Sequence, residues 1–184
     1  MAINGYLTDL DGTLCNTKEA NVIAYKAAFD ELNVPFDEPS YRSNFGLEFN
    51  DMMTKIASDY QEKWPLIAQL KAQYYKQLGY LISPNEALIT ILKDAKLAGK
   101  KIGLASTAKS INAKTVLEGL GIVDLFDATV FAEDVIHKKP DPECYNKLLV
   151  DLSLTADECI IFEDTEIGIT AGEATGAHVL KVSL

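Results

Sequence analysis

The sequence has few cysteines and no long apolar run. Its three cysteines, Cys15, Cys144 and Cys159, form no C-x-x-C pair, so neither a disulfide framework nor a zinc site is expected. No apolar run approaches the roughly 18 residues that a membrane helix requires, and residues 1–4 do not resemble a signal peptide. We therefore expect a cytoplasmic protein whose 184 residues form one large domain or a core with an appendage.

Basic residues are also in the minority. The chain carries 17 Lys and Arg against 27 Asp and Glu, for a net charge of −10. A field of this sign repels nucleic acids, and no basic run offsets it. We expect a monomer without a nucleic-acid or membrane partner. The same field opposes an anionic substrate, so a phosphorylated substrate requires a metal and a few lysines that reverse the potential locally.

The most informative stretch is GYLTDLDGTL at residues 5–14. A short apolar run at residues 3–7 is typical of a buried strand, and Asp9 and Asp11 follow it. Side chains at positions i and i+2 of an extended chain point the same way, so these carboxylates should converge, and Gly12 then allows a turn. Their hard oxygens suit Mg²⁺, which would keep both ionised. A strand that merely runs into an acidic turn is the alternative at this point.

The remainder of the chain divides into a helical block and an alternating region. Residues 17–78 follow a helical period without strand-like alternation. The segment Ser83-Pro84-Asn85-Glu86 reads as a capping box, which predicts a helix from Pro84 to about Ala98. Beyond it we predict strands at residues 101–105, 128–131, 159–162 and 178–182, and helices at residues 111–120, 142–152 and 167–175.

This alternation predicts an α/β fold, a parallel Rossmann-like sheet with right-handed crossovers and helices on both faces. The first strand belongs to the same sheet. The predicted core is therefore discontinuous, residues 1–14 and 82–184, with an all-helical insertion at residues 15–81. Ligands of such sheets bind beyond the carboxyl ends of the strands. The chemically active residues at or just after these ends are Asp9, Asp11, Ser106, Thr107, Lys139, Glu163 and Asp164.

These clusters, in this order, resemble the haloacid dehalogenase-like superfamily of phosphohydrolases. Within it the chain is most similar to the β-phosphoglucomutase-like phosphatases, which carry a helical cap. Any one of the matching stretches occurs by chance in other proteins, but all four together, with a helical block in the expected gap, strongly indicate this superfamily. The resemblance covers nearly the whole chain. The four stretches are DLDGT at residues 9–13, LAST at 104–107, KPDP at 139–142, and FEDT at 162–165 followed by Gly168-Ile169.

The resemblance implies a Mg²⁺-dependent phosphatase that hydrolyses a small phosphomonoester, such as a sugar phosphate. Asp9 would attack phosphorus and form an aspartyl-phosphate, and Asp11 would act as acid for the leaving alcohol and base for water. The metal would be held by Asp9, Asp164 and the backbone carbonyl of Asp11, with Glu163 orienting its water shell. The residues implied to hold the phosphoryl oxygens are Ser106, Thr107 and Lys139.

Each of these residues also has an ordinary structural interpretation. Ser106 could cap the helix that follows it, and Glu163 with Asp164 could cap the helix from residue 165. Lys139 could be a solvated loop lysine, and its neighbour Lys138 competes for its role, although the KPDP register favours Lys139.

The cap loop at residues 44–50 includes Gly46 and Phe49, which the resemblance places among the residues that select the substrate. In the β-phosphoglucomutases an arginine three residues after the cap-loop glycine grips the second phosphate, and a histidine follows the second aspartate by ten residues. Phe49 and Asn21 stand at those positions here, which favours hydrolysis over phosphoryl transfer between sugars, unless Arg42 substitutes for the missing cation.

Other functions remain alternatives at this point. A sugar phosphomutase of the same family is one. A phospho-receiver signalling domain also combines acidic residues, a hydroxyl and a lysine on a parallel sheet, but it has no helical insertion and no need of Asp11. A catalytically silent binding module is a third alternative, and the intact set of catalytic side chains argues against it.

Overall fold

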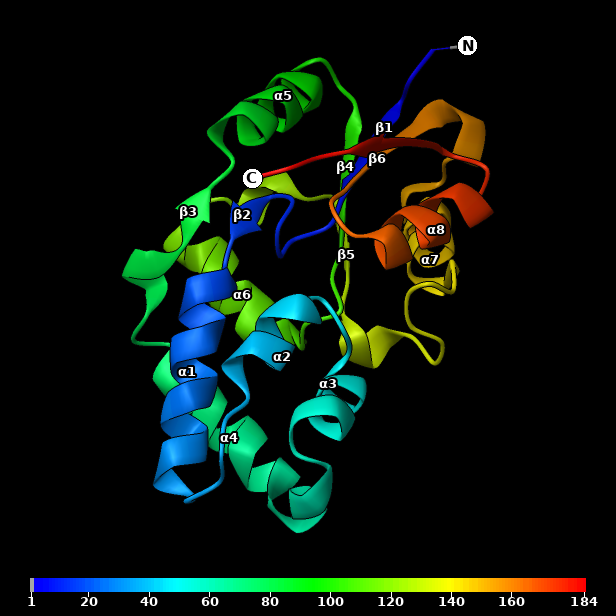
Figure 1. Cartoon of the computed structure of the whole chain (residues 1–184). Coiled ribbons are helices and arrows are strands. Elements are labelled where there is room, and N and C mark those ends of the chain that lie inside the picture. The colour runs from blue at the N-terminus through cyan, green and yellow to red at the C-terminus, as the bar shows by residue number, and fades with distance from the viewer. Residues whose placement is uncertain (1) are drawn as a thin grey trace. The chain divides into compact units, whose positions relative to one another are not determined.

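The computed structural model describes residues 2–184, and the chain divides into two compact units. One unit runs to Asn16 and resumes as Pro84–Leu184, and the other is Thr17–Ser83. The predicted borders lay at residues 14/15 and 81/82. Figure 1 shows the elements of both units.

Within residues 2–184, the larger unit is built on a five-stranded sheet in the order β5-β4-β1-β6-β7. Its neighbouring strands are all parallel. This arrangement confirms the predicted α/β fold, and it places β1 at the centre, between β4 and β6. The strands are β1 (Gly5–Thr8), β4 (Lys101–Ala105), β5 (Ala128–Val130), β6 (Cys159–Glu163) and β7 (His178–Lys181).

Helices cover both faces of this sheet, as the alternating pattern predicts (Figure 1). One face carries α5 (Glu86–Leu97) and α6 (Ser110–Gly119), and the other carries α7 (Glu143–Leu152) and α8 (Glu166–Ala174). Gly103 allows the close approach of α7, because a Cβ there would lie 2.7 Å from Leu7 and 3.1 Å from Leu152. Short 3₁₀ turns, η3 (Val123–Leu125), η4 (Ala132–Asp134) and η5 (Ala156–Glu158), lie in the connections.

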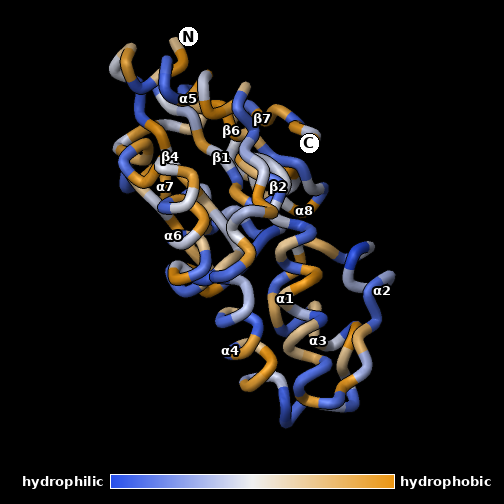
Figure 2. The backbone as a smooth tube through the Cα atoms, turned by 90° about the vertical axis from the view of Figure 1, so that its left-hand side faces the viewer, coloured by the Kyte–Doolittle hydropathy of each residue, from blue (hydrophilic) through white to orange (hydrophobic). Residues whose placement is uncertain are grey.

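The smaller unit is helical and has an apolar cluster of its own. Its helices and 3₁₀ turns are α1 (Lys18–Glu31), α2 (Glu38–Ser43), α3 (Phe49–Ile56), η1 (Ser58–Lys63), α4 (Trp64–Tyr75) and η2 (Gly79–Leu81). Figure 2 shows the hydrophobic stretches of α1 and α4. Aromatic rings fill much of the cluster, where Phe36 packs between Phe29 and Tyr41 at centroid distances of 5.1 and 5.7 Å.

The predicted capping box at Ser83 is wrong. Ser83 and Pro84 form the short strand β3 (Ser83–Pro84), which pairs with β2 (Cys15–Asn16). Asn85 caps α5 instead, and its side-chain oxygen accepts a hydrogen bond from the Leu88 N–H at 3.2 Å. Its amide group also donates to the Thr13 carbonyl at 3.0 Å. Asn85 thus ties the start of α5 to the turn after β1, and the extended Ser83-Pro84 pair cannot open a helix.

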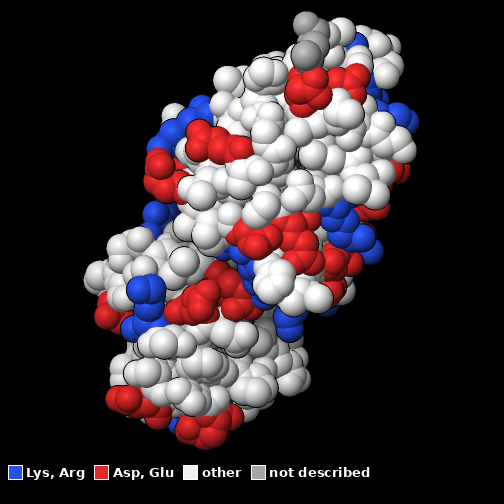
Figure 3. Space-filling view, turned by 90° about the vertical axis from the view of Figure 1, so that its right-hand side faces the viewer, with Lys and Arg blue, Asp and Glu red and all other residues white. Residues whose placement is uncertain are grey.

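The surface reflects the excess of acidic residues. The face in Figure 3 carries several groups of Asp and Glu side chains with Lys and Arg between them, in keeping with the net charge of −10. Among the helices of residues 2–184, none combines the length and the apolar character that a membrane crossing requires.

Candidate active site

Asp9 lies directly after β1, and its backbone is fixed by β6. Its N–H donates to the Phe162 carbonyl at 3.0 Å, and its own carbonyl accepts the Thr8 hydroxyl at 2.8 Å. The residue is only 8% exposed. A carboxylate is therefore held at the carboxyl end of the central strand, where ligands of parallel sheets bind.

The turn after Asp9 brings Asp164 to the same place. The Thr13 hydroxyl donates to Asp164 Oδ1 at 2.9 Å. Gly12 adopts a φ of 99°, which favours glycine, and a Cβ on it would lie 2.2 Å from Asp164 Oδ2. Both features of Gly12 are thus required: its backbone conformation makes the turn, and its missing side chain leaves room for the carboxylate.

Lys139 points into this acidic group from the loop before α7. Its ammonium donates to Asp9 Oδ1 at 2.7 Å, to Glu163 Oε1 at 2.6 Å and to the Ala105 carbonyl at 3.2 Å. The side chain is 3% exposed, so the three bonds engage its three N–H donors away from water. It is Lys139, the lysine that the KPDP register favours, whose ammonium makes these contacts.

Glu163, the last residue of β6, is fully buried and accepts four hydrogen bonds. Oε1 accepts from Lys139 and from the Tyr145 hydroxyl at 2.7 Å, while Oε2 accepts from the Asp164 N–H at 3.1 Å and the Thr165 hydroxyl at 3.4 Å. A Cβ on Gly168 would lie 2.1 Å from the Glu163 carboxylate. The start of α8 therefore leaves room for this side chain only because residue 168 is glycine.

Ligand oxygens of Asp9, Glu163 and Asp164 all lie within 4.8 Å of one another. When these three groups and Lys139 are all ionised, two negative charges remain uncompensated in a site that is largely buried. An all-oxygen donor set with this charge fits a hard divalent cation. The side chain of Asp11 is not part of this group of donors. The metal contact predicted for Asp11 involves its backbone carbonyl and not its side chain, so this observation does not test it.

The electrostatics of the site show the same imbalance. Burial raises the pKa of Asp9 well above its usual value, Lys139 opposes this shift, and Glu163 and Asp11 add to it. Burial likewise raises the pKa of Asp164, against the hydrogen bond from Thr13. Burial alone would lower the pKa of Lys139, but Asp9, Tyr145 and Glu163 raise it well above its usual value. A cation at the carboxylates would favour the ionised form that a nucleophilic Asp9 requires.

Ser106 and Thr107 follow β4 at the same edge of the sheet. Ser106 is 6% exposed, its N–H donates to the Val130 carbonyl at 2.9 Å, and its hydroxyl accepts the Ala108 N–H at 3.0 Å. It does not cap α6, whose N-cap residue is Lys109. Thr107 is half-buried. The Ala105 carbonyl, which accepts from Lys139 at 3.2 Å, immediately precedes this pair, so the Lys139 ammonium lies at the end of β4.

Gly46 and Phe49, the two predicted residues of the cap loop, belong to the helical unit. Gly46 lies between α2 and α3 with a φ of 98°, and Phe49 opens α3 and packs against the apolar cluster of that unit. The sequence had not singled out Tyr145, which lies buried beneath Glu163. The only signal for it was its position three residues after Pro142, at the buried face of the following helix.

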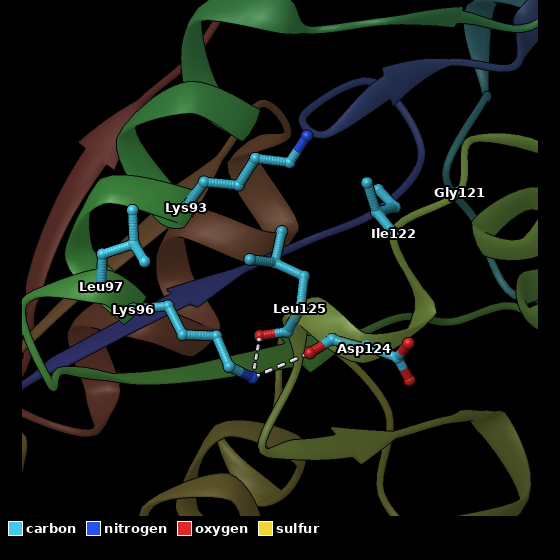
Figure 4. A pocket seen from close by; sticks show the side chains of 7 residues that line it. All are labelled: Lys93, Lys96, Leu97, Gly121, Ile122, Asp124 and Leu125. Atoms are coloured by element: carbon cyan, nitrogen blue, oxygen red, sulfur yellow. Dashed lines mark hydrogen bonds between the residues drawn. The ribbon is translucent and has the colours of Figure 1, made fainter.

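A separate pocket of about 350 Å³ lies in the larger unit and contains none of these residues. Figure 4 shows its walls, where the Lys96 ammonium donates to the carbonyls of Asp124 and Leu125. The residues that line it are Lys93, Lys96, Leu97, Gly121, Ile122, Asp124 and Leu125. The largely apolar lining lacks the paired carboxylates that metal or phosphate chemistry requires.

The fold and this site define an α/β protein with a carboxylate cluster at the end of its central parallel strand. The sequence profile of the haloacid dehalogenase-like hydrolase family matches residues 6–182, and the chain belongs to this family. This membership confirms the resemblance seen in the sequence. It also argues against the phospho-receiver alternative, which has no inserted helical unit.

Individual relatives are similar to this chain over most of its length. The β-phosphoglucomutase of Bacillus subtilis is 29% identical to this chain over 185 residues. The aligned region covers 95% of this chain and 80% of the relative. The validoxylamine A 7′-phosphate phosphatase of Streptomyces hygroscopicus is 27% identical, and the aligned region covers 92% of this chain and 81% of that phosphatase. The crystal structure of the Clostridium difficile β-phosphoglucomutase superimposes with a TM-score of 0.86 at 27% identity, covering 99% and 85% of the two chains. The relatives thus include both a mutase and a phosphatase.

Proposed function

We propose that this protein is a Mg²⁺-dependent phosphatase that hydrolyses a small phosphomonoester through an aspartyl-phosphate on Asp9. One observation carries the proposal: Asp9, Lys139, Glu163 and Asp164 meet at the carboxyl end of β1 in a buried cluster of oxygens with one ammonium. The substrate class follows from family membership together with this cluster. A sugar phosphate or a similar metabolite is the expected substrate.

In the proposed reaction an oxygen of Asp9 forms a bond to phosphorus as the ester P–O bond breaks. The leaving alkoxide takes a proton from Asp11. A water molecule then attacks phosphorus, gives its proton to Asp11, and releases inorganic phosphate while the Asp9 carboxylate is restored. Lys139 and the hydroxyls of Ser106 and Thr107 hold the phosphoryl oxygens as negative charge spreads over them.

The donor set fits a divalent cation. Asp9 and Asp164 would hold Mg²⁺ with their side chains and Asp11 with its backbone carbonyl. When bound, the ion supplies positive charge that favours ionised Asp9 and offsets the charge of the phosphoryl group. Glu163 is already engaged by four donors, which suits a contact through water better than direct ligation.

The proposal is tested with Asp9→Asn and a panel of small phosphate esters. The amide is nearly isosteric but cannot attack phosphorus, so turnover should fall by about 10³-fold or more. Asp151→Asn, an exposed change on α7, is the matched control and should retain activity. Excess chelator should abolish the activity of the unmodified protein, and added Mg²⁺ should restore it. Normal turnover of Asp9→Asn, or in excess chelator, would refute the mechanism.

A sugar phosphomutase is the second candidate, because two of the relatives are β-phosphoglucomutases. The contacts of the helical unit favour hydrolysis. The Arg42 guanidinium is occupied by Glu19 at 2.5 and 3.0 Å and by Glu38 at 2.8 Å, and Phe49 is neutral. Asn21, in the position of the mutase histidine, is buried and donates to the Thr17 carbonyl at 3.1 Å.

The two functions are separated by their products. With β-glucose 1-phosphate and a trace of the bisphosphate, a phosphatase releases inorganic phosphate as the main product. A mutase produces glucose 6-phosphate faster than phosphate. The second outcome would show that Phe49, Asn21 and Arg42 have been misinterpreted.

A further inference from the structure

The buried Tyr145 contacts both Lys139 and Glu163, which bond to each other. Its hydroxyl donates to Glu163 Oε1 at 2.7 Å, and the Lys139 ammonium lies 4.9 Å from the centre of its ring. Tyr145 and Glu163 are both fully buried. A tyrosine that served only to fill the space under α7 would need the ring but not the hydroxyl, since phenylalanine fills nearly the same volume.

The hydroxyl occupies a specific place in the hydrogen-bond network. Glu163 Oε1 accepts two donors, the Tyr145 hydroxyl and the Lys139 ammonium. The same ammonium bonds Asp9 Oδ1. Without the hydroxyl, Oε1 would keep Lys139 as its one donor, and the carboxylate would be held on its other side by the Asp164 N–H and the Thr165 hydroxyl at Oε2. The direction in which the ammonium points would then be less well fixed.

We propose that Tyr145 is a positioning residue that acts through Glu163 to hold the Lys139 ammonium on Asp9. The face of its ring stabilises the same cation, so that hydroxyl and ring together favour one position of the lysine. This role rests on the proposed function where it concerns turnover. The placement of the ammonium itself can be measured without turnover.

The test compares Tyr145→Phe with Tyr6→Phe. Tyr6 lies on β1 and stacks on Phe162 at 6.4 Å between ring centres, so its change removes a tyrosine hydroxyl from the larger unit without removing any of the hydrogen bonds that fix Lys139 and Glu163. Tyr145→Phe should lower kcat/KM by about 10-fold or more, because a less well fixed Lys139 ammonium stabilises the charge on the phosphoryl oxygens less. It should also weaken inhibition by inorganic phosphate, because Lys139 is the proposed phosphate contact. Tyr6→Phe should leave both unchanged.

Rescue separates positioning from packing. 4-Aminophenylalanine at position 145 keeps the ring and a hydrogen-bond donor, and it should recover most of the kcat/KM lost in Tyr145→Phe. A role in packing alone predicts no such recovery. If the Tyr145→Phe protein does not fold, the 4-aminophenylalanine protein still provides the comparison with the unmodified chain.

Crystal structures of the unmodified protein and of Tyr145→Phe complete the test. Loss of the 2.7 Å contact between Lys139 Nζ and Asp9 Oδ1 in the variant supports the inference even if no phosphate ester is hydrolysed, in which case only the proposed function fails. An unchanged contact with unchanged kcat/KM overturns the inference and leaves the proposed function intact.

Discussion

Replacement of Gly168 by alanine tests the packing of the site directly. A Cβ at this position would lie 2.1 Å from Glu163 Oε1 and 2.2 Å from Oε2, far inside contact distance. Glu163 has no free space to move into, because it is fully buried and bonded to Lys139 and Tyr145. Alanine at residue 168 must therefore displace either the carboxylate or the first turn of α8.

The expected cost is the sum of three effects. Alanine favours a helix over glycine by roughly 0.5–1 kcal/mol. Overpacking costs about 1–3 kcal/mol, and disturbing a hydrogen bond to a buried charged group costs about 1.5–3 kcal/mol. The net destabilisation is then about 1.5–5.5 kcal/mol, which lowers the melting temperature by roughly 3–22 °C for a chain of this size. Turnover should fall as well, because Lys139 loses its partner.

Gly119→Ala is the matched control. Gly119 ends α6, and no atom lies within 4 Å of the position that its Cβ would take. This change should leave activity unaltered and stability equal or up to about 1 kcal/mol higher. Thermal unfolding followed by circular dichroism, together with ester hydrolysis, measures both variants. If Gly168→Ala matches Gly119→Ala in both assays, Glu163 is not confined by α8 as the structure indicates.

Three further predictions concern the acid, the thiols and the helical unit. Asp11→Ala should slow alkyl phosphates far more than activated aryl phosphates, whose leaving groups need less protonation; equal losses would contradict its role as acid. Cys15, Cys144 and Cys159 should react slowly with Ellman's reagent at pH 8 in the folded protein, because burial raises the pKa of Cys144 and Cys159 to about 11 and that of Cys15 further. Rapid modification of the folded protein would contradict this. If residues 17–83 act as a cap that closes over small substrates, a folded phosphoprotein should be dephosphorylated much more slowly than a sugar phosphate, and comparable rates would rule the cap out.

The inner strands of the sheet, β1, β4 and β6, could be predicted because they are largely buried and read as short apolar runs. Even so, the first strand was placed at residues 3–7, whereas β1 is Gly5–Thr8. Thr8 is polar but pairs with Leu104 and Phe162, so tertiary pairing carries the strand one residue beyond the apolar run. The start of α5 was misplaced for a related reason. Ser83 and Asn85 are both residue types that cap helices, so the sequence around them does not decide which one caps α5. The contact of Asn85 with the turn after β1 decides between them.

The carboxylates and the lysine of the site could also be listed from the sequence, because parallel strands bring their carboxyl ends to one edge. The network that joins them could not. Tyr145 and Glu163 are 18 residues apart, and nothing local indicates that the hydroxyl of one lies 2.7 Å from the other. Glu163 was expected near the water shell of a metal, but its four hydrogen bonds became visible only in three dimensions. Donors and acceptors can be identified from the sequence, but which donor bonds to which acceptor cannot.

The charge of the site leads to a last prediction, that inorganic phosphate binds weakly until a divalent cation is bound. When ionised, Asp9, Glu163 and Asp164 carry three negative charges, of which the Lys139 ammonium offsets one, and that ammonium has its three donors engaged by Asp9, Glu163 and the Ala105 carbonyl. A phosphate dianion therefore meets two uncompensated negative charges and an ammonium that is already bonded.

Calorimetric titration of phosphate at constant ionic strength, with Mg²⁺ and with chelator, measures the effect. We expect binding at least about 10-fold tighter with Mg²⁺, equivalent to 1.4 kcal/mol. Linkage then requires that saturating phosphate tighten Mg²⁺ binding by the same factor, which a separate titration checks. Asp164→Asn removes one of the negative charges and should shrink both effects together. Equal phosphate affinity with and without Mg²⁺ would show that Lys139 leaves Asp9 for the anion unaided, and that the buried charges are balanced in some other way.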